Sequence, residues 1–133
     1  MTVDLGGQVA LVTGASRGIG HAVAVRLGAA GATVAVHYGK SASVAETLAA
    51  DLGHGSHAFR ADLETPGAAQ ALFDAIEAAY GRVDIVIANA GTFEEAPLDT
   101  PLDAWIAAWD RTRAGALRPG AALVAGVLFV QLL

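Results

Sequence analysis

Thr13-Gly14-Ala15-Ser16-Arg17-Gly18-Ile19-Gly20 is the most informative stretch of this sequence. It follows Val9–Val12, a short apolar run whose length and glycine stop predict a buried strand. From Ile19 to Ala30 the apolar residues recur at helical spacing, and Gly31 marks the end of the predicted helix. A glycine turn between a strand and a helix lets the backbone approach an anion, and the helix start attracts negative charge. Taken alone, such a turn can also be an ordinary helix opening, so its context decides.

Further strands and helices alternate along the chain. Short apolar runs predict strands at residues 33–36, 57–60 and 83–88. Helical spacing links Val44, Leu48 and Leu52 in one segment and Leu72, Phe73, Ile76 and Tyr80 in the next. We expect Ser43 to cap the first of these helices with Glu46 in the capping-box position, and Pro66 to lie in the first turn of the second.

A fourth helix is predicted from Pro101 to about Ala114. Strands that alternate with helices form a parallel sheet covered on both faces. We therefore predict an α/β fold, a three-layer doubly wound parallel sheet that is truncated after about four strands.

Composition excludes several classes of protein. The chain has 133 residues, 54% of them hydrophobic, which suits one folded domain. Its net charge of −5 argues against nucleic acid or an anionic membrane as a partner. It has no cysteine, and its four histidines show no metal-ligand spacing, so we expect solvated histidines and no metal site. Residues 1–8 show no secretory signal, which favours a cytoplasmic location.

The spacing of the glycine turn is Thr-Gly-x-x-x-Gly-x-Gly, and two further motifs follow later strands. Asp62-Leu63 comes after the third strand, and Asn89-Ala90-Gly91 comes directly after the fourth. Together these motifs resemble the short-chain dehydrogenase/reductase family over residues 5 to about 112. The resemblance implies a Rossmann fold whose ligand binds at the carboxyl ends of the strands. Residues 1–112 are then an incomplete NAD(P)-binding domain, and residues 113–133 are a divergent apolar tail.

The resemblance assigns cofactor-binding roles to this edge of the sheet. The glycine turn would hold the pyrophosphate, Asp62 would meet the adenine, and Asn89 would lie beside the ribose, although Asn89 could also merely cap its strand. The candidate cofactor-binding residues are Gly14, Ser16, Arg17, Gly18, Ile19, Gly20, Tyr38, Lys40, Ser41, Asp62, Leu63, Asn89, Ala90 and Gly91.

The residues after the second strand bear on the choice of cofactor. NAD-binding domains usually place a carboxylate there, to accept from the ribose 2′-hydroxyl. This chain has Tyr38, Gly39, Lys40 and Ser41 instead. Arg17 and Lys40 could bind a 2′-phosphate, with Ser41 adding a hydrogen bond. This pattern resembles the NADP-preferring members, so NADP is expected and NAD is less favoured, while the alternative is that both cations are only solvated.

We identify no catalytic residue. The family uses a Tyr as acid and base, a Lys four residues later, a Ser from the fifth strand and an Asn in the fourth helix. Here Tyr38 and Tyr80 are followed at that distance by Ala42 and Asp84, and Ala116 stands where the Asn is expected. A tyrosine without a nearby cation is a poor base at neutral pH. We therefore expect the chain to be inactive alone.

The family pattern stops near Arg113. Pro119 is unfavourable in a helix interior, and Gln131 is the only polar side chain of residues 121–133. This apolar run is shorter than the roughly 20 residues of a membrane-spanning helix, so a membrane partner is not favoured. The tail is a frameshifted end, a divergent element of a shortened domain, or an anchor. An uncovered strand edge and apolar surface would also favour homo-oligomers.

Three hypotheses about function remain open. The chain belongs to an NADP-dependent oxidoreductase of alcohol and carbonyl substrates, or it is a non-catalytic nucleotide-binding or interaction module, or it is an inactive frameshifted fragment. A small-molecule substrate is implied only by the resemblance, and no residue identifies it.

Overall fold

The computed structural model describes residues 2–91, 101–104 and 106 of the chain. These residues contain a parallel sheet of four strands in the order β3-β2-β1-β4. The strands are β1 (Val9–Val12), β2 (Thr33–Tyr38), β3 (His57–Arg60) and β4 (Ile85–Ile87). The helices between them are α1 (Gly18–Ala29), α2 (Ala42–Leu52) and α3 (Ala68–Tyr80).

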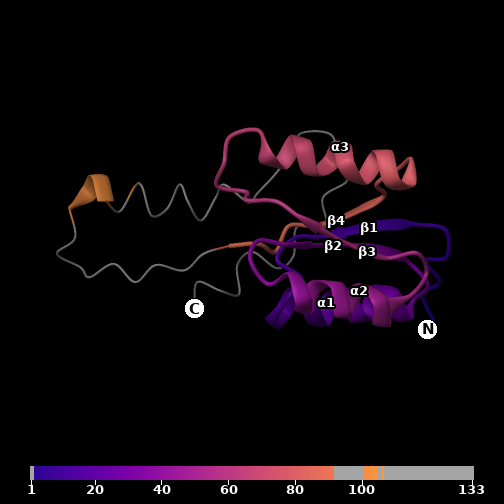
Figure 1. The fold of residues 1–133 in the computed structure, drawn as a ribbon. Coiled ribbons are helices and arrows are strands. Elements are labelled where there is room, and N and C mark those ends of the chain that lie inside the picture. Colours follow the sequence, from indigo (N-terminus) through magenta and orange to yellow (C-terminus); the bar gives the residue numbers. More distant parts are fainter. Residues whose placement is uncertain (1, 92–100, 105, 107–133) are drawn as a thin grey trace.

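The helices lie on both faces of the sheet, with α1 and α2 on one side and α3 on the other (Figure 1). This arrangement confirms the predicted three-layer α/β fold with a doubly wound parallel sheet. It arises because each crossover between neighbouring parallel strands needs a helix that returns the chain to the starting edge.

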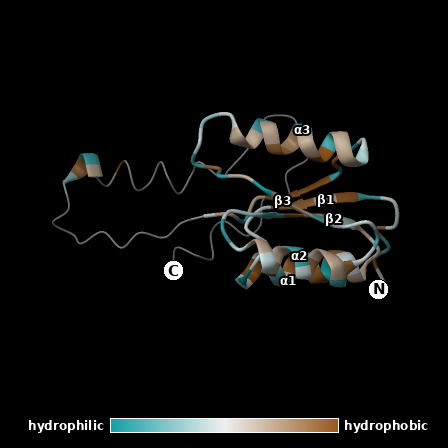
Figure 2. Ribbon diagram, viewed as in Figure 1, coloured by the Kyte–Doolittle hydropathy of each residue, from teal (hydrophilic) through white to brown (hydrophobic). Residues whose placement is uncertain are grey.

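The centre of the sheet is hydrophobic, as its brown strand segments in Figure 2 show, whereas β3 at the edge has exposed His57 and Arg60 at its ends. Ala10 and Val12 of β1 belong to the core under α1 and α2, whereas Val9 and Leu11 pack on the α3 side. This alternation follows from the two-residue period of a strand. Because both faces are covered, β1 is a continuous apolar run, which is why the sequence identified it without ambiguity.

The strand order creates a break in the winding at β1. The chain moves outward from β1 to β2 and β3, then crosses back so that β4 pairs with the other side of β1. In open parallel sheets, the carboxyl ends of strands at such a break are where ligands bind. The segments that follow β1 and β4 therefore define the edge at which a site is expected.

Several predicted boundaries are wrong. Strand β2 continues to Tyr38, which we expected to follow the strand, because its second half pairs with β3. Helix α2 begins at Ala42 with Ser41 at the N-cap, so Ser43 is not the cap. Helix α3 begins at Ala68 after Gly67, whose φ of 83° marks a turn, so Pro66 precedes the helix. The ends of these strands and helices depend on backbone conformation and strand pairing, which residue preferences alone do not reveal.

Helix α2 also faces the sheet differently from the prediction. Val44 is 46% exposed, whereas Ala45, Leu48 and Ala49 are buried. Small alanine side chains let the helix lie close to the sheet, and Val44 then points outward. The same holds for α1, where Ile19 is exposed and Gly20, Ala24 and Gly28 are buried.

The predicted fourth helix is only partly described. Residues 102–104 and 106 are helical, and Leu102 and Ile106 are exposed. The rest of that prediction and the tail from residue 113 lie outside the described residues.

Candidate functional site

The glycine turn links β1 to α1 at the carboxyl edge of the sheet. Gly14 and Gly18 have φ values of 62° and 60°, and Arg17 is the extended N-cap residue of α1. No side chain caps the start of this helix. The first amide groups of a helix have no partners within it, so they offer donors and a positive dipole end to an anion. Ser16, Arg17, Gly18 and Ile19 are at least partly exposed beside this helix start.

Gly14 and Gly20 cannot carry a side chain in this arrangement. A Cβ on Gly14 would lie 2.9 Å from the Cα of Ala90. A Cβ on Gly20 would lie 2.5 Å from the carbonyl oxygen of Gly14 and would also collide with Asn89 Nδ2. The glycines therefore allow the turn, the first residues of α1 and the segment after β4 to pack directly against one another.

Asn89 holds the glycine turn in place. Its Nδ2 donates to the carbonyl oxygens of Thr13 and Gly14, at 3.1 and 3.2 Å. Its side chain therefore does more than cap β4, because it joins two loops that are distant in sequence. Ala90 lies in the same contact, and Gly91 is exposed next to it.

Thr13 is a positioning residue that the sequence reasoning did not single out. Its buried hydroxyl accepts from the amides of Asn89 and Ala90, at 3.0 and 2.9 Å, and donates to the carbonyl of Ile87. The hydroxyl thus uses its donor and two acceptor positions to fix the chain after β4. Its place directly before the first glycine was the available signal.

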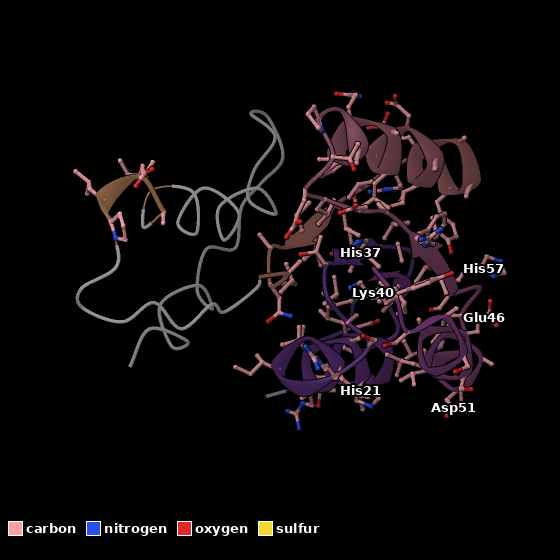
Figure 3. All side chains as sticks on the ribbon, turned by 60° about the vertical axis from the view of Figure 1, so that its left-hand side comes forward. His21, His37, Lys40, Glu46, Asp51 and His57 are labelled. Carbon is pink, nitrogen blue, oxygen red and sulfur yellow. The ribbon has the colours of Figure 1, made fainter. Side chains whose placement is uncertain are left out.

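His37 is the second residue that was missed. The prediction that the histidines are solvated is wrong for it, because only 3% of His37 is exposed. Its Nδ1 accepts from the amide of Gly14 at 2.9 Å, and Nε2 lies 2.9 Å from the carbonyl of Ala61. Burial lowers the pKa of His37, and the contact with Ala61 only partly opposes this. Figure 3 shows His37 inside the fold and His57 at its outer surface.

Stability should depend on the protonation of His37. Because its folded pKa is lowered, the unfolded chain binds a proton more readily than the folded chain. The free energy of unfolding should therefore be highest above the ordinary pKa of 6.5 and fall as the pH drops through the folded pKa. Urea unfolding of the wild type and His37→Asn as a function of pH checks this. The pKa of Asp84 is also lowered, chiefly by its hydrogen bond with Arg82, but this carboxyl affects the free energy of unfolding only below about pH 3.8. A wild-type profile that is flat below 6.5 would contradict the expectation.

Of the residues predicted to lie at the 2′-phosphate, Tyr38, Lys40 and Ser41 are at the end of β2, whereas Arg17 is at the start of α1. Tyr38 is half-buried against the α1 and α2 side of the core, and Lys40 and Ser41 are exposed at the start of α2. Arg60 of β3 donates to the carbonyl of Gly39 at 3.3 Å, which brings a further guanidinium to this turn. A basic, accessible surface follows β2, and no carboxylate stands there.

Asp62 folds onto its own turn. Its carboxylate accepts from the amide of Glu64 at 3.1 Å and from the hydroxyl of Thr65 at 3.3 Å. Leu63 is half-buried and packs on the α3 side of the core. Asp62 is exposed after β3, next to Ala61, which His37 connects to the glycine turn.

Tyr80 has a structural environment. Its hydroxyl donates to the carbonyl of Gly55 at 2.9 Å, and its ring stacks on His57 and meets Phe59 edge-on. Burial raises its pKa. Gly55 precedes β3, so Tyr80 lies at the amino end of the strands, away from the glycine turn.

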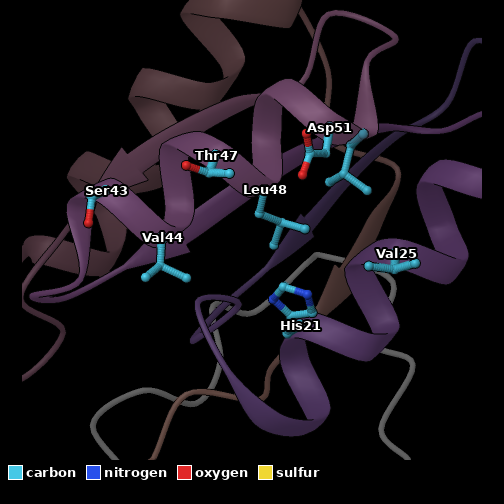
Figure 4. Close-up of a pocket in the computed structure, with 8 residues that line it drawn as sticks. His21, Val25, Ser43, Val44, Thr47, Leu48 and Asp51 are labelled. Carbon is cyan, nitrogen blue, oxygen red and sulfur yellow. The ribbon is translucent and has the colours of Figure 1, made fainter.

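A groove of about 420 Å³ lies between the outer sides of α1 and α2 (Figure 4). Val25, Val44, Leu48 and Leu52 give it an apolar lining, with His21 and Asp51 among the polar residues. None of the predicted cofactor residues lines it, so it is separate from the glycine turn.

The part of the chain that the structure describes holds no cluster of three His, Asp or Glu side chains that could bind a metal ion. No helix among the described residues is long and apolar enough to cross a membrane.

Known proteins are similar to this chain in sequence and fold. A family model described as short chain dehydrogenase matches residues 8–119. The chain is 47% identical over 90 residues to the short chain dehydrogenase/reductase nsrJ of Aspergillus novofumigatus, covering 65% of this chain and 34% of the relative. It superposes with a TM-score of 0.70 and 42% identity on a short chain dehydrogenase from Burkholderia cenocepacia in complex with NADP, covering 83% of this chain and 45% of that one.

A second solved structure is the landomycin C-6 ketoreductase LanV with bound NADP and rabelomycin. The TM-score is 0.67 at 39% identity, and the match covers 84% of this chain and 48% of that one. The chain thus spans about a third of the length of the curated relatives it matches and about half of these solved structures. The family match, the strand order and the glycine turn with its Asn89 contact agree, and this chain belongs to the short-chain dehydrogenase family.

Proposed function

We propose that this chain binds NADP at the carboxyl edge of its sheet, as the nucleotide-binding part of an oxidoreductase of alcohol and carbonyl substrates. The observation that carries the proposal is the start of α1, which no side chain caps and which Thr13, Asn89 and the glycines hold in place. An anion at this position meets amide donors and the helix dipole. The relatives with bound NADP have the same fold and share 39% to 42% of the sequence in the matched region.

Residues 14, 16 and 18–20 would hold the pyrophosphate, and residues 89–91 would lie beside the adenosine ribose. Arg17, Lys40 and Ser41 would receive the 2′-phosphate, with Tyr38 next to them. Asp62 and Leu63 would border the adenine. NADPH supplies a hydride when bound, and the residues named here bind and orient the nucleotide without moving a proton.

The proposed division of the chain is an NAD(P)-binding domain over residues 1–112 and a divergent segment over 113–133. The proposed location of the protein is cytoplasmic.

The 133 residues contain no Tyr with a Lys four positions later, which favours nucleotide binding without turnover as the second candidate function. NADPH titration beside a turnover assay separates the two.

The preference for NADPH over NADH tests whether Arg17 and Lys40 bind the 2′-phosphate. Charge-assisted hydrogen bonds contribute about 1.5–3 kcal/mol each, so Arg17→Ala with Lys40→Ala should reduce NADPH affinity by at least about a hundredfold. NADH affinity should change little. Fluorescence titration at low salt and at about 0.2 M salt should show the preference narrowing with salt. Arg26→Ala, which removes an exposed cation from the far end of α1, is the matched control. Equal affinity of the wild type for both nucleotides at both salt concentrations would reject the assignment.

A further inference from the structure

His37 connects three segments of the site through one ring. It lies in β2, its Nδ1 accepts from the Gly14 amide in the glycine turn, and its Nε2 contacts the Ala61 carbonyl after β3. The backbone carbonyl of His37 also accepts from the amide of Ala15 at 3.0 Å. The turn is therefore tied to the second strand on one side, as Asn89 ties it to the fourth on the other.

These partners fix the protonation state of the ring. The Gly14 amide can only donate, so Nδ1 must be the unprotonated nitrogen. The Ala61 carbonyl can only accept, so the proton is on Nε2. A second proton on Nδ1 would place two N–H groups against each other at the distance of the present hydrogen bond, 2.9 Å. Protonation must break the contact with Gly14 or displace the turn.

Backbone groups, and no ionisable side chain, bond the ring on both sides. The charged side chains near the ring form hydrogen bonds with other groups or are exposed to solvent. Arg60 donates to Gly39, and Asp62 is engaged by its own turn. Lys40 and Arg17 are exposed, as are Asp74 and Glu77 of α3, the helix on the same face of the sheet. Among the described residues no carboxylate hydrogen-bonds the ring, so the contact that favours its charged form is the one with the Ala61 carbonyl, and burial outweighs it.

We infer that His37 is a positioning residue whose neutral form holds the glycine turn in the shape that binds the dinucleotide pyrophosphate, so that nucleotide affinity falls when the ring gains a proton. The inference rests on the proposed function. Because burial lowers the pKa of His37, the site becomes sensitive to pH below the range in which an exposed histidine titrates. His37 itself is not proposed to contact the nucleotide.

The test compares the pH dependence of NADP⁺ binding in the wild type and two variants. In His37→Asn, Oδ1 stands the same number of bonds from Cβ as Nδ1, so it can still accept from Gly14, but it cannot be protonated. His37→Leu removes both contacts. Between about pH 8 and pH 5, wild-type affinity should fall about tenfold more than that of His37→Asn, the effect of losing one hydrogen bond at the turn. His37→Leu should bind weakly throughout.

The 2′-phosphate also titrates, with a pKa near 6, but it does so equally for every variant. The difference between the profiles therefore reports the protein alone. Parallel profiles of the wild type and His37→Asn would overturn the inference, whereas absence of wild-type binding at about pH 8 would overturn the proposed function instead.

If the variants do not fold, the wild-type ring gives an independent answer. Nitrogen chemical shifts of the His37 imidazole distinguish a protonated Nε2 from a protonated Nδ1. The expected result is an unprotonated Nδ1 with a pKa below the ordinary 6.5, and a shift of the Gly14 amide signal on titration. A proton on Nδ1 at neutral pH, or a Gly14 amide indifferent to the titration, would contradict the role.

Discussion

Gly20→Ala should weaken nucleotide binding strongly and destabilise the fold. The new methyl group would lie 2.5 Å from the carbonyl oxygen of Gly14 and would also collide with Asn89 Nδ2. Neither can yield cheaply, because the first is backbone and the second holds the turn through two hydrogen bonds. Overpacking of this kind costs about 1–3 kcal/mol of unfolding free energy. A displaced turn should also lower NADPH affinity by about two orders of magnitude, or roughly 2.8 kcal/mol.

Gly28→Ala is the matched control for Gly20→Ala. It makes the same change in the same helix at another buried glycine. Its methyl group would meet Leu52 Cδ2 at 2.7 Å, and the end of a leucine side chain can shift. Binding by Gly28→Ala should match that of the wild type in calorimetry, and the better helix propensity of alanine offsets part of the crowding. Similar affinity losses in both variants would show that crowding against the turn is not the cause.

Thr13→Val should produce the second large effect. Valine has nearly the same shape as threonine, but it leaves the amide of Ala90 without its acceptor, whereas the amide of Asn89 keeps the carbonyl of Ile87 at 3.0 Å. An unsatisfied buried amide costs about 1–3 kcal/mol, so we expect a loss of that size in urea unfolding, reduced where water reaches the half-buried group. NADPH affinity should fall in parallel, because the segment after β4 supports the glycine turn.

Thr13→Ser separates the hydroxyl from the methyl group. Serine keeps the donor and both acceptor positions and loses one buried methyl, which costs about 1 kcal/mol. It should therefore remain close to the wild type in NADPH affinity. If valine stays close to the wild type while serine is destabilising, the methyl contact matters and the hydroxyl network does not.

The layered fold could be predicted because strands buried on both faces leave an unmistakable pattern. Val9–Val12 and His57–Arg60 have the predicted bounds, and the order of strands and helices is as expected. The faces of helices were harder to predict. Valine and isoleucine suggested the buried stripes, but Val44 and Ile19 are exposed, since alanine and glycine permit closer packing on the sheet.

The site residues that belong to a sequence motif could be predicted. Those whose role depends on contacts with other strands were missed. The glycine spacing and Asn89 are recognisable as sequence patterns. His37 gave no such signal, because its role depends on Gly14 and Ala61, which parallel pairing brings to it from other segments. A single histidine in a loop-like stretch is indistinguishable from a solvated one until the topology is known.

Calorimetric titration of the chain with NADPH tests directly whether the carboxyl edge of the sheet binds the nucleotide. The expected result is binding at one site, tighter for NADPH than for NADH, weakened about a hundredfold in Gly20→Ala and retained in Gly28→Ala. A folded chain that releases no binding heat with either nucleotide, and is unaffected by them in thermal unfolding, would contradict it.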